Sequence, residues 1–134
     1  MANARLIPML IAAGAVAAAG CGGSDSLRPA DAAAARDGLK AALDAWASGE
    51  SAESLNRRPT PIYMADDDWH RGARLVGYEI TGEGSALGVN HCLPVRLSLR
   101  DPKGKEIRKE VWYTVATSPV IAISREDRRR RGDS

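Results

Sequence analysis

Apolar residues recur at steps of three and four through residues 30–48, and this spacing predicts an amphipathic helix. The positions on its apolar stripe are Ala32, Ala35, Leu39, Leu43 and Trp46. Pro29 suits the first turn of a helix, and Gly49 is a natural stop. We therefore expect one helix at the start of the folded part, with its apolar face packed against another layer.

From residue 74 the period changes to two, which is typical of half-buried strands. The pattern predicts four strands, over 74–81, 91–100, 105–116 and 120–124. In the second of these the apolar positions that share a face are Leu93, Val95, Leu97 and Leu99. Asp101-Pro102-Lys103-Gly104 predicts a turn, so the second and third strands should form an antiparallel hairpin. Pro94 lacks an N–H donor, which favours an edge position or a strand start.

Shorter elements are expected between the helix and the first strand. Residues 51–55 predict one further helical turn, and residues 56–61, with two prolines, predict a surface connection. Asp66-Asp67-Asp68 before Trp69 predicts the cap and first turn of a short helix. Residues 82–88 are rich in glycine and are expected to form a flexible loop.

The predicted fold class is therefore α+β, with one N-terminal amphipathic helix packed on an antiparallel sheet of about four strands. This order of elements resembles the cystatin-like and ketosteroid-isomerase-like rolls, in which a sheet curls around a helix. Residues 69–75 form a Trp-x-x-Gly-x-x-Leu segment. That segment is similar to one in small uncharacterised bacterial lipoproteins, and the resemblance implies no particular activity.

The N-terminal segment has the plan of a secretory signal. Arg5 precedes an uncharged run over residues 6–19, and small residues follow. The run is shorter than the roughly 20 apolar residues that a spanning helix needs. It ends in Ala18-Ala19-Gly20-Cys21, which resembles the lipobox of bacterial lipoprotein precursors, with Ala18 where leucine is usual.

This resemblance implies that the Cys21 thiol receives a diacylglycerol, that the chain is cut before Cys21, and that the new amine is acylated. Two or three acyl chains would then anchor the protein stably to a membrane of the cell envelope, facing the periplasm or the exterior. Ordinary cleavage near Ala19 is the alternative, and it would release a plain secreted protein.

The chain then divides into a lipoprotein signal peptide (1–20), a lipidated tether (21–28), one α+β domain (29–125) and a disordered basic tail (126–134). The tail carries four consecutive arginines, Arg128 to Arg131, which are able to touch anionic lipid headgroups. Nearby acidic residues dilute this charge, so a solvated tail is the favoured interpretation.

Charge and cysteine content exclude some classes of partner and constraint. The chain has 19 basic and 17 acidic residues, and removing Arg5 with the signal leaves the mature chain near neutral. A nucleic-acid partner is therefore not indicated, whereas an unidentified protein partner stays open. With Cys21 lipidated, Cys92 has no intrachain disulfide partner and is expected to be buried.

No residue set predicts a catalytic, cofactor-binding or metal site. Asp66-Asp67-Asp68 offers carboxylates for a cation, but consecutive side chains diverge, so helix capping is favoured. His70, His91 and Cys92 lie in separate elements without the spacing of a metal site. A Cys92 nucleophile would need His70 nearby in space.

Two other features of the sequence bear on function. The spacing Gly82-x-Gly84-x-x-x-Gly88 precedes a strand instead of a helix, which argues against a dinucleotide loop. A roll with an open cavity would make the protein a small enzyme or ligand carrier, and the candidates for its interior are Tyr63, Asp68, His70 and Tyr78. We expect instead a lipid-anchored binding or structural module that is not an enzyme.

Overall fold

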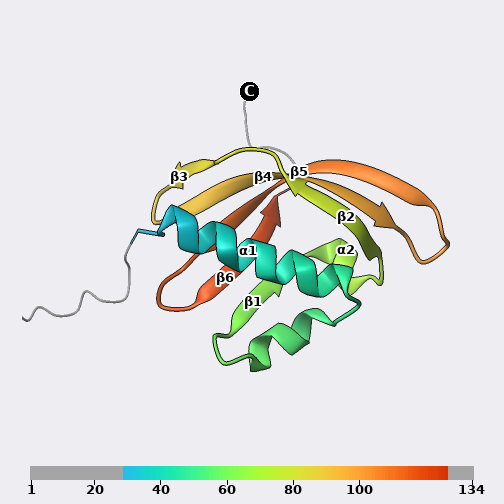
Figure 1. The fold of residues 1–134 in the computed structure, drawn as a ribbon, viewed down its shortest axis with the longest axis horizontal. Coiled ribbons are helices and arrows are strands. Elements are labelled where there is room, and N and C mark those ends of the chain that lie inside the picture. The colour runs from blue at the N-terminus through green and yellow to red at the C-terminus, as the bar shows by residue number, and fades with distance from the viewer. Residues whose placement is uncertain (1–28, 127–134) are drawn as a thin grey trace, which may run out of the picture.

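The computed structural model describes residues 29–126, which form an α+β fold in which a curled sheet packs on a helix (Figure 1). The helices are α1 (Ala32–Ala47), the 3-10 helix η2 (Ala52–Arg57) and α2 (Asp67–His70). The strands are β1 (Ile62–Ala65), β2 (Arg74–Ile80), β3 (Ser85–Leu87), β4 (Asn90–Arg100), β5 (Glu106–Ala116) and β6 (Ile121–Glu126). The predicted signal, Cys21, the tether and the arginine run lie outside the described residues.

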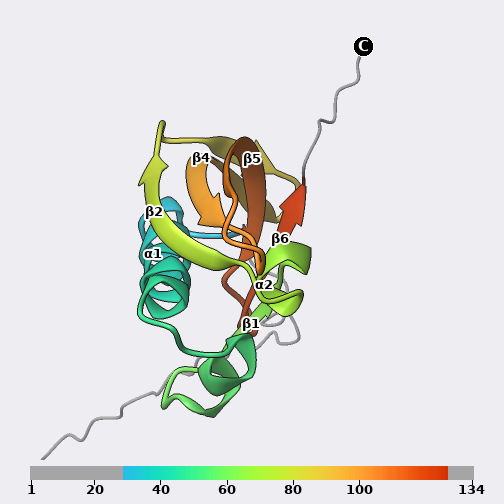
Figure 2. The same cartoon turned by 90° about the vertical axis from the view of Figure 1, so that its right-hand side faces the viewer.

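The sheet has six strands in the order β1-β6-β5-β4-β2, with β3 paired to β4. The prediction of about four strands in a wholly antiparallel sheet was wrong, because β1 and β3 are additional and β1 runs parallel to β6. Figure 2 shows the sheet curling over α1, and β2 carries a bulge between Leu75 and Gly77 that accompanies this bend.

Helix α1 confirms the predicted amphipathic helix and is the first element of the described residues. The Asp31 side chain caps its start by accepting the Ala33 N–H. At the other end Gly49 adopts φ +92°, and the N–H of Glu50 reaches back to the Ala45 carbonyl. The buried stripe of α1, including Leu39 and Leu43, joins the apolar face of the sheet in one core.

The β4–β5 hairpin is the central pair of the sheet and was also predicted correctly. All four leucine and valine positions predicted for the inner face of β4 are buried. In the turn, the Gly104 N–H donates to the Asp101 carbonyl, and the Asp101 carboxylate accepts the N–H groups of Lys103 and Lys105.

The two strands that sequence patterns missed are short. β1 has four residues and follows Pro61, and its partner β6 lies far away along the chain. All three residues of β3 are exposed, so no alternation of apolar and polar positions marks it. The predicted fourth strand is also longer than expected, because β6 continues through Arg125 to Glu126.

Pro94 lies in an interior strand, so the expected edge position was wrong. Its carbonyl accepts the Thr81 N–H. On this side of β4, residues 95–100 pair with β2 and residues 90–92 pair with β3, so Pro94 lies between the two partner strands. The N–H and C=O of one strand residue point to the same side. The missing donor of Pro94 therefore falls at this break between two partner strands and leaves the β5 ladder intact.

Gly84 precedes β3 at a position that admits no side chain. It has φ +73°, and an added Cβ would lie 1.9 Å from the Cys92 carbonyl oxygen. We expect Gly84→Ala to lower the free energy of unfolding by about 2–3 kcal/mol, through both backbone strain and this overlap. Urea unfolding followed by tryptophan fluorescence measures the effect.

Gly88→Ala is the matched control for that substitution. Gly88 also has a positive φ, +61°, but nothing lies within 4 Å of its Cβ position. Gly88→Ala should lower the free energy of unfolding only by the cost of backbone strain, about 1–2 kcal/mol. Equal losses at the two glycines would contradict the overlap at Gly84.

Candidate functional site

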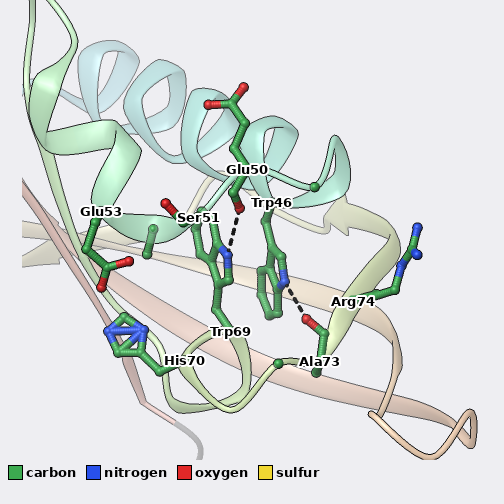
Figure 3. A pocket seen from close by; sticks show the side chains of 11 residues that line it. Trp46, Glu50, Ser51, Glu53, Trp69, His70, Ala73 and Arg74 are labelled. Carbon is green, nitrogen blue, oxygen red and sulfur yellow. Dashed lines mark hydrogen bonds between the residues drawn. The ribbon is translucent and has the colours of Figure 1, made fainter.

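A surface hollow of about 370 Å³ lies where α1, η2, α2 and β2 meet (Figure 3). Its floor is the pair Trp46 and Trp69, whose rings stack with centroids 5.1 Å apart and planes 5° from parallel. The polar side chains around it are Glu50, Ser51, Glu53, His70 and Arg74. This volume is near the lower end of the range for small-ligand sites.

Both indole N–H groups are held by backbone carbonyls. Trp46 Nε1 donates to the Ala73 carbonyl at 2.8 Å, and Trp69 Nε1 donates to the Glu50 carbonyl at 3.1 Å. These bonds tie α1 to the start of β2, and α2 to the segment that follows α1. The tryptophan pair therefore shapes the hollow and holds its walls together.

The rim of the hollow is charged. Glu50 accepts hydrogen bonds from Ser54 Oγ and from the Arg58 guanidinium, so its carboxylate is engaged. Figure 3 shows Glu53 and His70 on one side of the hollow and Arg74 on the other. The arrangement thus presents a carboxylate and an imidazole opposite a guanidinium, which suits a small polar ligand.

A buried ionic cluster lies at the start of α2. Asp66 is 2% exposed, and its carboxylate accepts the N–H groups of Asp68 and Trp69, which confirms the predicted cap. The same carboxylate accepts the Tyr113 hydroxyl at 2.6 Å and pairs with Arg125 Nη1 at 3.2 Å. One carboxylate therefore joins α2 to two strands of the sheet.

Tyr113 and Asp68 complete this cluster. Burial, together with the Asp66 carboxylate, raises the pKa of Tyr113 well above 10.0, so its hydroxyl remains a donor. Asp68 pairs with Lys109 Nζ and with Arg125 Nη1, each at 2.8 Å. Burial acts to raise the pKa of Asp68, but the hydrogen bonds from Lys109 and Arg125 outweigh it, and the pKa lies below 3.8.

The lowered pKa of Asp68 makes stability depend on acid. The Asp68 carboxylate takes up its proton at a higher pH in the unfolded chain than in the folded domain. Its contribution to the free energy of unfolding is therefore complete above the ordinary pKa near 3.8, and it decreases as the pH falls through the pKa of the folded domain. We expect Lys109→Met to lower the free energy of unfolding by about 1 kcal/mol at neutral pH. The difference from wild type should shrink below about pH 4.

Urea unfolding at several pH values tests this, with Lys103→Met as the matched control. Lys103 lies in the exposed β4–β5 turn, and its ammonium has no ion-pair partner among residues 29–126. Its removal should change stability little at any pH. A Lys109→Met deficit that stays constant down to pH 3 would contradict the lowered pKa of Asp68.

The four residues proposed for an isomerase-like interior do not share one cavity, although Tyr63 and His70 both line a second surface hollow of about 230 Å³. Tyr63 is 45% exposed on β1, and the Tyr78 hydroxyl donates to the Asp44 carboxylate. Asp68 is engaged by the two basic side chains described above, and only His70 of the four lines the tryptophan hollow. The inner face of the sheet is instead filled by the apolar core.

The candidate metal and thiol residues also have separate surroundings. His91 Nε2 bonds to the Glu83 carbonyl, and Cys92 Sγ lies 3.4 Å from Thr114 Oγ1. Cys92 is buried, as predicted. Within residues 29–126, no group of three or more potential ligands is placed to hold a metal ion. None of the helices in that range is long and apolar enough to cross a bilayer.

Sequence reasoning missed the partners of Asp66. Tyr113 lies within the predicted strand 105–116, and Arg125 lies just beyond the predicted strand 120–124. The available signal was the inner register of β5, on which Tyr113 and Lys109 lie between valine and isoleucine. A polar residue on a predicted apolar face requires a buried partner.

Comparison with known proteins gives no relative: no protein-family model, curated protein or solved structure matches the chain.

Proposed function

We propose that this protein is a lipid-anchored module of the cell envelope, held to a membrane through acylated Cys21. The observation that carries the proposal is the order of an uncharged run, the lipobox-like Ala18-Ala19-Gly20-Cys21 and, after a short tether, a folded domain. A tether of this kind leaves the domain facing the periplasm or the exterior. Its role there is to bind or to support a partner.

The tryptophan hollow supports a binding role. Within the described residues the polar ends of the Glu53, His70 and Arg74 side chains have no hydrogen-bond or ion-pair partner, although they surround a concave surface. Unpaired groups of both signs around a depression are available to a polar ligand. The rival cavity enzyme has less support, because Asp68 and Tyr78 are already paired and Tyr63 is 45% exposed on β1.

Metabolic labelling tests the anchor. The full chain, expressed in a bacterial host supplied with a clickable fatty acid, should incorporate the label, and Cys21→Ser should abolish incorporation. Cys92→Ser is the matched control, since Cys92 is a buried thiol, and it should label like wild type. An unlabelled wild type, or equal labelling of Cys21→Ser, would overturn the proposal.

The mature N-terminus separates the anchored form from a plain secreted protein. Mass spectrometry should find a chain that begins at acylated Cys21. An unmodified chain that begins near Gly20 would favour secretion instead.

A further inference from the structure

We propose that one end of the domain, the apolar end, rests on the lipid surface, with Leu87, Val89 and Val120 in contact with lipid. This inference rests on the proposed anchor at Cys21. The three side chains are 45%, 42% and 44% exposed, and they are half of the large apolar residues that the described chain exposes. Exposed apolar groups that gather in one place mark an interaction surface.

The register of the sheet places these residues at the same end. Leu87 is the last residue of β3, and Val89 lies in the turn that joins β3 to β4. Both are close to the pair His91–Val115. Val120 lies in the connection that leads from β5 into β6, just beyond that pair. Figure 1 shows the β3–β4 turn and the β5–β6 connection at the same end of the molecule.

The anchored segment joins the domain at this end. The Ala30 N–H donates to the Val89 carbonyl at 2.9 Å, which fixes the start of the domain beside the β3–β4 turn. Nine residues lead from Cys21 to Ala30. An extended chain spans at most about 3.3–3.6 Å per residue, so the apolar end lies within roughly 30 Å of an anchored Cys21.

Charge separates the two ends of the domain. Residues 85–90 and 117–120 carry no charged side chain, although Asp31, the cap of α1, lies nearby. The opposite end is the β4–β5 turn, whose charged residues are Arg100, Asp101, Lys103, Lys105 and Glu106. β4 has 11 residues and separates the ends by about 35 Å. The apolar end, near which Asp31 and Glu83 carry charge, is therefore better suited than the β4–β5 turn to the boundary between headgroups and acyl chains.

Site-specific fluorescence tests this orientation. The acylated protein is reconstituted into phosphatidylcholine vesicles with a fluorophore at position 89 in Val89→Cys, or at position 103 in Lys103→Cys. Cys92 is buried, and the parent protein, which lacks the introduced cysteines, serves as the control for any labelling of Cys92. Nitroxide-labelled phosphatidylcholine should quench the label at position 89 about threefold more than the label at position 103.

The outcomes separate this inference from the anchor itself. Vesicles that fail to carry the protein in flotation would overturn the anchor and the inference together. Protein that floats with equal quenching at the two positions, or stronger quenching at position 103, would overturn the orientation alone. Adding Leu87→Asp and Val120→Asp to the labelled Val89→Cys protein should lower quenching about twofold without loss of flotation; unchanged quenching would show that these side chains do not contact lipid.

Discussion

Replacing Asp66 with alanine should lower the free energy of unfolding by about 3–5 kcal/mol, because it removes one member of a buried charged cluster. The substitution leaves Arg125, whose side chain is 6% exposed, without its Asp66 partner. It also leaves the buried Tyr113 hydroxyl without its acceptor and removes the cap of α2. Urea unfolding followed by tryptophan fluorescence gives the loss directly.

Asp67→Ala is the matched control in the same acidic triplet. Asp67 is exposed in the first turn of α2 and makes no side-chain hydrogen bond or ion pair within residues 29–126. Its removal should cost at most about 0.5 kcal/mol, through the helix dipole. A similar loss for the two variants would mean that the whole triplet acts through general charge, and the specific cluster around Asp66 would be refuted.

Tyr113→Phe divides the Asp66 effect further. It retains the ring in the core and removes the hydroxyl that donates to Asp66. We expect a loss of about 1.5–3 kcal/mol, the range for a hydrogen bond to a charged group. In the double variant with Asp66→Ala the two losses should not add, because they remove the same contact.

Trp46→Ala should lower the free energy of unfolding by about 3–5 kcal/mol, the usual cost of removing a buried aromatic side chain. Trp46 is 3% exposed, stacks on Trp69 and donates to the Ala73 carbonyl. The truncation leaves that carbonyl without its indole donor and opens a void beneath the hollow. Urea unfolding followed by circular dichroism is suitable, since the change removes a fluorophore.

Trp112→Ala is the control with the same change of side chain. Trp112 lies on the outer face of β5 and is 42% exposed. Its loss should cost about 1 kcal/mol or less. The contrast reflects the burial of Trp46 together with its stacking on Trp69 and its hydrogen bond to the Ala73 carbonyl. Equal losses at the two tryptophans would contradict the packing of Trp46 in the core.

Trp46→Phe tests the hydrogen bond separately from the packing. Phenylalanine keeps an aromatic ring against Trp69 but has no N–H for the Ala73 carbonyl. We expect an intermediate loss of about 1–3 kcal/mol. If the hollow binds a polar ligand, this variant should also weaken that binding, because Ala73 and Arg74 form part of its wall.

Local patterns predicted the elements whose contacts are close along the chain. The α1 stripe, the turn at Asp101–Gly104 and the long hairpin follow from spacing and turn chemistry between residues that are close along the chain, with His91 and Val115 as the most distant pair of the hairpin. The capping role of Asp66 was predicted for the same reason, since its backbone donors lie two and three residues away. The interpretation of Cys21 as an anchor is likewise local, and it remains a proposal.

The missed features depend on contacts between distant residues. Tyr113 and Arg125 reach Asp66 from 47 and 59 residues away, and β1 pairs in parallel with the last strand. The periodic spacing of apolar residues does not indicate these long-range contacts, because their partners meet only after the sheet has curled. The sequence by itself determined an amphipathic helix, a hairpin and a chain with a lipobox-like start. Only the tertiary structure decided which aspartate is buried, where the tryptophan hollow lies and that Ala30 meets the β3–β4 turn. Each of these results from segments that folding alone brings together.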